Sequence, residues 1–432
     1  CYRNCQYRWT GPGGGSYGNT EMLSIPEIKR DQAGSFTCTV TNPAIVTNPA
    51  INDTSATASI SVTVLYGPDP GSVMLSPNKT LYEQVENSSL SVNCSSDCYR
   101  NCQYRWSGPG GGNFGNISVL SIPQMRRGHT GVFTCTVTNP GITSKSATAT
   151  ITLTVFYPPT ISIESRNGSV TETGLLINCT AHGIPAKYIF SLIHSSLFSG
   201  IKIRQLIDID SVYTGVFVHR LTNPSLMDTG VYTCIVSNGI MDYMDGSLDK
   251  NVSETVWIRG PPNVTSSETD FYAEKGHPGR LVIEFYNSLL DANVTWKKKR
   301  NQTLEKLENS DKYNISVSSK NVTVKFYSVF LQQPGFIATL EIQNVTEEDF
   351  GSEDDLSSYQ VLLQNSVGNS SELALNLRPR GRPDVPKDVH IVPNSITSRS
   401  VGIEWMSGFH GGSDQTFVIE YKTQKDENWT NY

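Results

Sequence analysis

Residues that commonly carry catalysis are spread thinly along this chain of 432 residues. The seven histidines fall far apart in the sequence, at His129, His182, His194, His219, His277, His390 and His410. No serine or cysteine has an identifiable base within its own stretch of sequence, which nucleophilic catalysis requires. We therefore predict a protein that is not an enzyme and that holds no cofactor.

A glycine-rich segment has the spacing of a dinucleotide-binding loop, with Gly110, Gly112 and Gly115 at the required positions. The residues that follow, 117–120, alternate like a β-strand. A bound pyrophosphate needs the N-terminus of a helix at this point. We therefore expect no nucleotide site here.

Two clusters of charged residues have alternative interpretations. The acidic residues 347–349 and 353–355 could bind Ca²⁺, but they lack the spacing of a calcium loop and are expected to form a solvated insert. The basic residues 297–300 could attract a sulfated glycan, although the simpler interpretation is the charged end of a strand entering water.

Nine cysteines are an odd number, and an internal repeat explains the count. Residues 1–43 align without a gap on residues 98–140, with 30 of 43 positions identical. In the second copy Cys94 lies just before Cys98, so the equivalent partner of Cys38 would lie upstream of Cys1. We expect that the chain is cut from a longer protein and that the partner of Cys38 is missing from it.

The Cys98 and Cys102 pair, repeated as Cys1 and Cys5, could be half of a zinc site or a local disulfide. No further His or Cys pair has the spacing of the other two zinc ligands. A turn can bring residues four apart within bridging distance, so we favour the disulfides Cys98–Cys102 and Cys1–Cys5 and predict no metal site.

The apolar pattern is that of short strands separated by turn residues, with no long helical period. In the second copy, residues 90–94, 103–106 and 132–137 alternate, which turns Cys94, Trp106 and Cys135 toward one side. Net charge is −6 with 17% charged residues, which argues against nucleic acid as a partner. The fold class is predicted to be all-β.

A Cys, a Trp about twelve residues later and a second Cys resemble the immunoglobulin superfamily, in which a disulfide joins two sheets against a buried indole. The resemblance implies a Cys94–Cys135 disulfide beside Trp106, with Trp9 as the equivalent core residue of the first copy. Residues 158–260 repeat the scheme with Cys179–Cys234 and with Phe190 in place of the Trp.

The most specific motif is the D-x-G-x-Y-x-C corner, which is present as Asp228, Gly230 and Tyr232 before Cys234. The resemblance implies that the Tyr hydroxyl bonds back to the main chain. In the two repeated copies the Tyr is replaced by Phe36 and Phe133, so there we expect ring burial without that bond.

Residues 261–380 contain no cysteine but follow the same register, with Val361 in one cysteine position and Phe285 in the other. Packing of both against Trp296 must offset the missing disulfide, which contributes about 4 kcal/mol on the loop-entropy model. The last segment resembles the first half of a fibronectin type III domain, which implies that Trp405 is a core residue.

The predicted fold is therefore a series of immunoglobulin-like β-sandwiches followed by a truncated fibronectin type III sandwich. Proline-rich boundaries predict semi-rigid linkers. The linker at residues 66–69 is similar to those of carcinoembryonic-antigen-type adhesion molecules. The predicted domains are residues 1–66 (lacking strands A and B), 67–157, 158–260, 261–380 and 381–432.

Asn-x-Ser/Thr sequons are far more frequent than chance pairing of asparagines would supply, and with paired cysteines they predict an extracellular or secreted glycoprotein. Two of the sixteen, Asn93 and Asn178, directly precede cysteines, where a tight strand hinders access. The other fourteen are predicted glycosylation sites: Asn52, Asn78, Asn87, Asn116, Asn167, Asn251, Asn263, Asn293, Asn301, Asn314, Asn321, Asn344, Asn369 and Asn428.

The resemblance implies a cell-surface recognition protein that mediates cell–cell adhesion through protein partners on the same or opposing cells, homophilically or heterophilically, or through glycans. No stretch approaches 18 consecutive apolar residues, so membrane attachment is expected outside this sequence. Residues 209–211 (Ile-Asp-Ser) resemble a short integrin-binding motif. The alternatives are a signalling-receptor ectodomain, a secreted matrix protein and a soluble immune molecule that binds microbial glycans.

Overall fold

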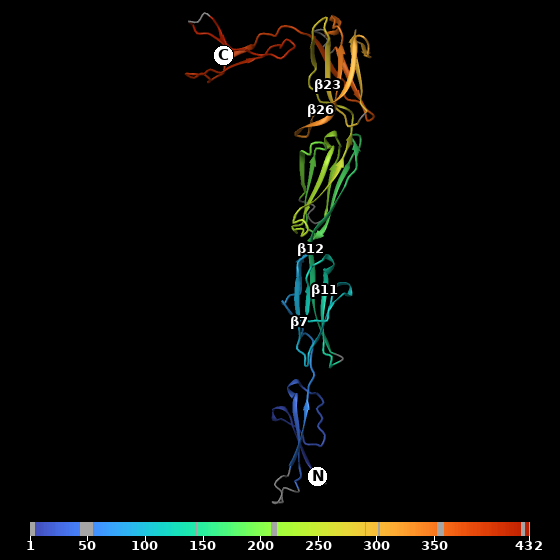
Figure 1. Cartoon of the computed structure of the whole chain (residues 1–432), viewed down its shortest axis with the longest axis vertical. Helices are drawn as coiled ribbons and strands as arrows, with labels where there is room; N and C mark the ends of the chain where they lie inside the picture. Colours follow the sequence, from blue (N-terminus) through green and yellow to red (C-terminus); the bar gives the residue numbers. More distant parts are fainter. Residues whose placement is uncertain are drawn as a thin grey trace. The chain divides into compact units, whose positions relative to one another are not determined.

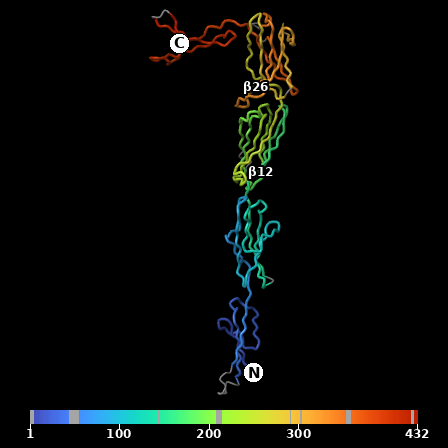
Figure 2. The backbone as a smooth tube through the Cα atoms, in the orientation of Figure 1, coloured from blue at the N-terminus to red at the C-terminus, as the bar shows by residue number. Residues whose placement is uncertain are grey.

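The computed structural model describes residues 5–43, 55–142, 145–208, 214–289, 291–300, 303–351, 358–424 and 428–431. In these residues the regular backbone consists of β-strands and short 3-10 helices, and the all-β prediction is confirmed (Figure 1). Figure 2 follows the backbone from blue at the N-terminus to red at the C-terminus. Contacts within the chain form two compact units. One unit comprises residues 1–160, 182–187 and 237–250, and the other comprises residues 161–181, 188–236 and 251–432.

Residues 5–66 form one sheet, here called the first sheet, with strand order β2-β1-β3-β4. Phe36 is fully buried in it, whereas Trp9 is only half-buried and departs from its predicted core position. The reason is that the described part of this segment places no second sheet over the indole, whose Nε1 donates to the Thr20 carbonyl at 3.1 Å. The elements are β1 (Gln6–Thr10), η1 (Pro12–Gly14), β2 (Ser16–Gly18), η2 (Arg30–Gln32), β3 (Gly34–Thr41) and β4 (Ser55–Val62).

Residues 67–157 form the second sandwich, with β10-β7-β5 facing a sheet in which β9, β8, β11 and β12 are neighbours and β6 pairs with β12 (Figure 1). Strict alternation along β7 turns Val92 and Cys94 into a core that also holds Trp106 and Phe133. The strands are β5 (Met74–Ser76), β6 (Leu81–Val85), β7 (Leu90–Ser95), β8 (Gln103–Ser107), β9 (Asn113–Gly115), β10 (Val119–Ile122), β11 (Gly131–Thr138) and β12 (Ser146–Glu164). The helices are η3 (Pro109–Gly111) and η4 (Arg127–His129).

Residues 161–260 contain the third sandwich, in which β14 pairs with β17 on one side and β16-β15-β18-β19 form the other. Its core holds Phe190, Tyr232 and the two cysteines Cys179 and Cys234, all fully buried. Its elements are β13 (Gly168–Ser169), β14 (Leu175–Ile184), β15 (Ile189–Ser195), β16 (Lys202–Asp208), β17 (Val216–Leu221), η5 (Leu226–Asp228), β18 (Gly230–Ser237), β19 (Lys250–Val256) and β20 (Ile258–Arg259).

Residues 261–379 contain the fourth sandwich, built from the sheets β21-β23-β27-β26 and β22-β29-β28-β24-β25. Phe285, Trp296 and Val361 are all buried in one core cluster. The elements are β21 (Asn263–Val264), β22 (Asp270–Ala273), β23 (Gly279–Tyr286), β24 (Asn293–Arg300), β25 (Thr303–Lys306), β26 (Tyr313–Phe326), β27 (Val329–Ile342), η6 (Glu347–Asp349), β28 (Tyr359–Gln364) and β29 (Leu373–Pro379).

The segment after residue 380 forms two separate strand pairs, β30 (Lys387–Ile391) with β31 (Ile403–Met406) and β32 (Glu420–Tyr421) with β33 (Thr430–Asn431). No hydrophobic side chain beyond Leu377 is buried in the described residues. Trp405 is therefore only partly buried, against the Phe417 ring 5.5 Å away, and it departs from its predicted core position. The fibronectin type III interpretation of this segment stays a prediction.

Four of the 3-10 helices recur at the same place, just before the strand that carries the second cysteine position. In each, the side chain of the last helical residue accepts a hydrogen bond from the main-chain N–H three residues earlier. This bond satisfies an N–H group that has no partner within the helix. The accepting residues are Gln32, His129, Asp228 and Asp349, at 2.7, 3.1, 2.9 and 2.9 Å. Across the described residues, the structure has no helix with the length and apolar character needed to cross a membrane.

Candidate binding surfaces

The first sheet and the second sandwich present the same polar residues in the same register. Each β-strand alternates between core and solvent, so the residues that lie between buried ones form an outward face. We call this surface the Ser/Thr face. In the first copy its rungs are Arg8, Thr39 and Thr57, then Thr10, Thr37 and Ser59, and in the second they are Arg105, Thr136 and Thr148, then Ser107, Thr134 and Thr150.

The Ser/Thr face of the second sandwich has no sequon on its strands. Asn78 and Asn87 lie outside the sheet's strands, Asn93 lies on β7 of the opposite sheet, and Asn116 follows β9 at the sheet edge. Sugar attached at these positions would leave the strands β8, β11 and β12 bare. The face is thus a hydroxyl-rich surface that occurs twice in one chain.

The loop closed by the Cys98–Cys102 disulfide is docked against the linker that precedes its own sandwich. The Tyr99 ring stacks on the Tyr66 ring with 5.9 Å between centroids. From the first sheet, Arg30 places its guanidinium 4.2 Å from the Tyr66 ring centroid and pairs with Asp69. The predicted stapled loop is therefore part of a domain junction.

A polar cluster lies at the corner of the third sandwich, where Tyr232 donates its hydroxyl proton to the Asp228 carbonyl at 3.0 Å. Asp228 also accepts from Arg204 at 2.8 Å. The His194 ring stacks on the Tyr232 ring at 4.4 Å and bonds the Thr229 carbonyl at 3.2 Å. The side chains of Asp228, Tyr232 and His194 are at least nine-tenths buried, whereas that of Arg204 is partly exposed.

Gly230 of the same motif leaves the space that this histidine fills, because a Cβ there would lie 2.4 Å from His194 Nε2. Burial lowers the pKa of His194 to about 4, against a weaker opposing effect of its bond to Thr229. Burial raises the pKa of Tyr232 to about 12. His194 is therefore neutral at physiological pH, and Tyr232 remains a donor.

The β26–β27 hairpin of the fourth sandwich reaches this corner with its tip. Tyr327 donates its hydroxyl proton to Asp228, and its ring lies 4.1 Å from the Arg204 guanidinium. Below the tip, Ile203 is buried against Val322 and Leu331 of the hairpin. The hairpin thus joins the third and fourth sandwiches within one compact unit.

The two charged clusters of the fourth sandwich are not both solvated. Lys298 is 1% exposed and donates at 2.5 Å to Asp349, which is 0% exposed and also pairs with Lys312 at 2.8 Å. Burial alone would raise the pKa of Asp349, but hydrogen bonds from the two lysines and Thr346 outweigh it and hold that pKa well below its usual range. The interpretation of these residues as solvated is wrong for Lys298 and Asp349, because each neutralises the other inside the sandwich.

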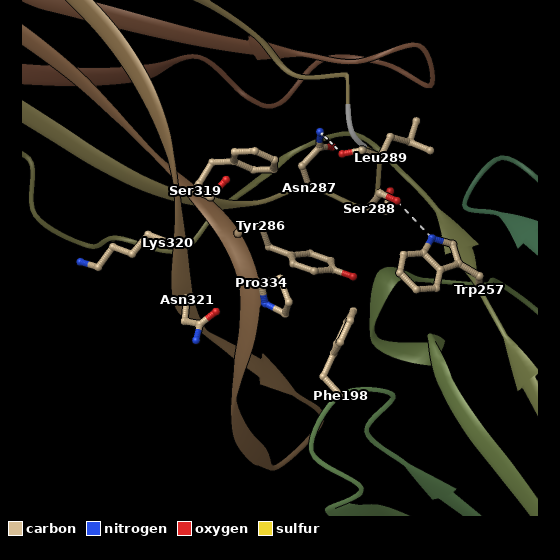
Figure 3. A pocket seen from close by; sticks show the side chains of 12 residues that line it. Phe198, Trp257, Tyr286, Asn287, Ser288, Leu289, Ser319, Lys320, Asn321 and Pro334 are labelled. Atoms are coloured by element: carbon tan, nitrogen blue, oxygen red, sulfur yellow. Dashed lines mark hydrogen bonds between the residues drawn. The ribbon is translucent and has the colours of Figure 1, made fainter.

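An aromatic groove lies where the third and fourth sandwiches meet, with a volume of about 620 Å³. We define it by Phe198, Trp257, Tyr286, Pro334 and Phe336. Figure 3 shows the rings of Phe198, Trp257 and Tyr286 around one central space, with Pro334 beside them. The Trp257 indole N–H donates to the Ser288 carbonyl at 3.1 Å, which fixes that ring (Figure 3).

No protein-family model matches the chain. Curated relatives include Dscam2 of Drosophila melanogaster, described as a cell adhesion molecule and 26% identical over 314 residues, which cover 71% of this chain and 13% of the relative. DSCAM of Gallus gallus, also described as a cell adhesion molecule, is 25% identical over 323 residues, covering 73% and 14%. Protein turtle of Drosophila melanogaster is 23% identical over 322 residues, covering 72% and 18%.

These relatives each align with more than two thirds of the chain. The chain is similar to cell adhesion proteins of the immunoglobulin superfamily. It spans between 13% and 18% of the length of these relatives. Among solved structures, an I-band fragment of titin aligns with a TM-score of 0.40 and 19% identity, covering 70% of this chain and 97% of the fragment. The complex of Dpr2 with DIP-Theta aligns with a TM-score of 0.46 and 14% identity, covering 71% and 99%.

The immunoglobulin disulfides of the structure join Cys94 to Cys135 and Cys179 to Cys234, with Cα–Cα distances of 6.6 and 6.3 Å. Cys38 has a free thiol and is half-buried. The predicted Cys1–Cys5 disulfide includes Cys1, which lies outside the described residues. Among the described residues, no three His, Cys, Asp or Glu side chains gather around a possible metal position.

The predicted sequons lie on the surface of the chain wherever the structure describes them. Two of them, Asn52 and Asn301, and the integrin-like motif at residues 209–211 lie outside the described residues. The exposed asparagines are Asn78, Asn87, Asn116, Asn167, Asn251, Asn263, Asn293, Asn314, Asn321, Asn344, Asn369 and Asn428. The sequence did not indicate the aromatic groove or the hairpin contact, because both combine residues from two different sandwiches.

Proposed function

We propose that this chain belongs to the extracellular part of a cell-surface protein that mediates cell–cell adhesion through its immunoglobulin-like domains, without catalysis. Relatives described as cell adhesion molecules align with more than two thirds of it. Disulfides inside two of the sandwiches and sequons exposed along the described surface fit an oxidising, glycosylating compartment.

The binding surface that we propose is the Ser/Thr face, and its duplication is the observation that carries the proposal. Hydroxyl groups on a flat sheet donate and accept hydrogen bonds, as the 2.8 Å contact between Thr37 and Ser59 illustrates. Each face carries one arginine, Arg8 or Arg105, at the same place in the register. Arginine is enriched at protein interfaces, where it can bind a carboxylate through two parallel bonds.

Two equal faces in one chain favour adhesion by weak contacts that add together. When one face has engaged, the second binds as an intramolecular event, which raises the overall affinity without new kinds of contact. The partner is a protein on the same or an opposing cell. A second copy of this chain is one such partner, and the test below separates it from a different protein.

The test adds a sugar to each face. Thr150→Asn creates a sequon with Thr152, and Ser59→Asn creates the matching sequon with Ser61 in the first sheet. These two positions are suitable because both are exposed and they are equivalent in the strand register. Beads coated with the full chain from a glycosylating host are tested for clumping with identical coats, and for adhesion to cells. We expect each single variant to weaken adhesion and the double variant to abolish it.

The matched controls carry the same asparagine without the sugar. The double substitutions Thr150→Asn with Thr152→Ala and Ser59→Asn with Ser61→Ala remove the hydroxyl that the sequon requires. Adhesion should therefore stay near that of the unmodified chain. Clumping of identical coats would assign the partner to a second copy, and adhesion to cells alone would assign it to a different protein. Undiminished adhesion of the fully glycosylated double variant would refute the Ser/Thr face as the binding surface.

A further inference from the structure

The aromatic groove contains a tyrosine hydroxyl that faces the open space and has no hydrogen-bond partner among the described residues. The Tyr286 side chain is 2% exposed, and in the part of the chain that the structure describes its hydroxyl makes no hydrogen bond. Figure 3 shows this hydroxyl pointing into the space between Trp257 and Phe198. Because this hydroxyl faces the groove and is not engaged within the described residues, it can donate a hydrogen bond to a ligand that supplies an acceptor at this point.

Two polar groups next to this hydroxyl are already engaged. Trp257 Nε1 donates to the Ser288 carbonyl at 3.1 Å, and Asn287 Nδ2 donates to the Leu289 carbonyl at 2.7 Å. Burial raises the pKa of Tyr286 to about 12, so its hydroxyl keeps its proton and can donate. The groove therefore offers the Tyr286 O–H group among apolar ring faces, which suits a ligand that combines an apolar face with oxygen acceptors. A pyranose sugar has this combination.

A sugar attachment sequence lies on the same groove. Asn321, Val322 and Thr323 form a sequon on β26, with Asn321 exposed and Val322 buried. Asn321 lies at the margin of the groove and is opposite Pro334 in the β26–β27 register. Pro334 lines the groove next to Tyr286 (Figure 3). A sugar chain that starts at Asn321 has only to fold back across this proline to reach the rings.

We propose that the aromatic groove binds the inner N-acetylglucosamine residues of a sugar chain attached to Asn321 of the same molecule. The sugar rings stack on Trp257 and Phe198, and a sugar oxygen accepts the hydrogen bond from Tyr286. This inference rests on the extracellular location proposed above. Because Phe198 and Trp257 come from the third sandwich and Tyr286 from the fourth, the bound sugar would strengthen the contact between them.

The experiment compares two sugars on one strand. The full chain from a glycosylating host is treated under native conditions with an endoglycosidase, and peptide mass spectrometry follows release at Asn321 and at Asn314. Asn314 is an exposed sequon of the same strand, away from the groove, and is the matched control. We expect release at Asn321 to be about tenfold slower than at Asn314, because a sugar held in the groove is accessible only when it dissociates.

A second measurement separates sugar binding from ordinary packing. Tyr286→Phe keeps the ring and removes the hydroxyl, so it should bring release at Asn321 toward the rate at Asn314. It should also lower the unfolding temperature of the glycosylated chain but leave it unchanged in a Thr323→Ala chain, which lacks the sequon. Thr323→Ser, which keeps the sequon, should behave like the unmodified chain.

Equal release rates at the two sites would overturn the inference, as would an equal effect of Tyr286→Phe with and without the sequon. Sugar on other sequons but none on Asn321 would also overturn it while leaving the extracellular location intact. A chain that carries no sugar at any sequon would remove both proposals together. Loss of bead adhesion with Asn321 still protected would leave the groove assignment standing.

Discussion

The side-chain amide of Asn139 donates a 2.8 Å hydrogen bond to the main-chain carbonyl of Tyr66, 73 residues earlier in the chain. The same nitrogen gives its other proton to the Tyr99 carbonyl, also at 2.8 Å. Asn139 is 3% exposed, so both bonds are shielded from water. One buried amide therefore ties the linker that enters the second sandwich to a loop of that sandwich.

The arrangement recurs at the next two junctions. Asn238 donates to the carbonyl of Tyr157 at 2.9 Å, and Asn365 donates to the carbonyl of Gly260 at 2.8 Å. Each asparagine follows the strand that bears the second cysteine position, β11, β18 or β28. Each linker is thus held by the domain that it enters, in addition to any stiffness that proline supplies.

Removal of one such amide should destabilise the chain measurably. Asn238→Ala leaves the carbonyls of Tyr157 and Pro185 without a donor, at a cost of about 1–3 kcal/mol. Asn238→Asp keeps the shape but has no N–H groups, so it should cost at least as much. Urea denaturation measures the loss, and hydrogen exchange of the linker amides should speed up in both variants. An unchanged exchange rate at the amides of Tyr157 and Thr160 would contradict the role of this amide.

The buried histidine predicts a pH dependence of stability. The pKa of His194 is about 4 in the folded chain, against 6.5 when exposed, so the unfolded state binds more protons between these values. Stability should therefore be complete above pH 6.5 and fall as the pH drops toward 4, by up to about 3 kcal/mol.

His194→Phe tests this dependence, because it keeps a ring against Tyr232 and cannot titrate. The difference in unfolding free energy between pH 7 and pH 4.5 should shrink in this variant, whatever its baseline stability. Denaturant unfolding at the two pH values measures it. His219, whose pKa burial also lowers, should leave a residual slope. An unaltered pH dependence would assign the effect to other groups.

The buried ion pair of the fourth sandwich predicts a different pH response. The pKa of Asp349 lies below 3.8 in the folded chain, so its contribution is present above pH 3.8 and is lost as the pH falls below that value. Asp349→Asn leaves Lys298 buried without its partner charge and should cost about 3–5 kcal/mol near neutral pH.

The matched control for this variant is Asp311→Asn, which changes an exposed aspartate of the same sandwich. It should shift the midpoint of denaturant unfolding very little. The slope of unfolding free energy below pH 4 should flatten in Asp349→Asn and stay unchanged in Asp311→Asn. Equal effects of the two variants would show that the buried pair has no special contribution.

The sequence was sufficient for the fold class, because two-residue alternation around Cys94, Trp106 and Cys135 can arise only from half-buried strands. The burial of Lys298 and Asp349 could not be predicted from the sequence in this way. A charged residue in an isolated sequence is assigned to solvent, and its partner lies 51 residues away. Neither residue carries a local signal of the other.

The tryptophans show why a sequence pattern alone does not establish a core position. A tryptophan at the expected spacing indicates a core position only if a second sheet covers it. Trp106 and Trp296 meet that condition and are fully buried, whereas Trp9 and Trp405 lie where the described residues supply no covering sheet. Tyr327, at the tip of an unusually long hairpin, had no sequence signature because its partners belong to the preceding sandwich.

Tyr327 provides the last prediction, since its backbone needs support. Its φ of 53° lies in the left-handed region, which a tyrosine adopts only when surrounding contacts hold it. Those contacts are the Asp228 carboxylate and the Arg204 guanidinium. Tyr327→Phe keeps the ring over Arg204 but removes the bond to a charged group, which contributes about 1.5–3 kcal/mol.

The expected result is local loosening of the hairpin tip, because the fourth sandwich keeps its own core in this variant. Hydrogen exchange of residues 326–331 should accelerate in Tyr327→Phe, while that of β24 should not change. Tyr243→Phe, at an exposed tyrosine that belongs to the other compact unit, should affect neither segment. If the tip exchanged at the same rate in all three proteins, the hydroxyl bond would have no part in joining the third and fourth sandwiches.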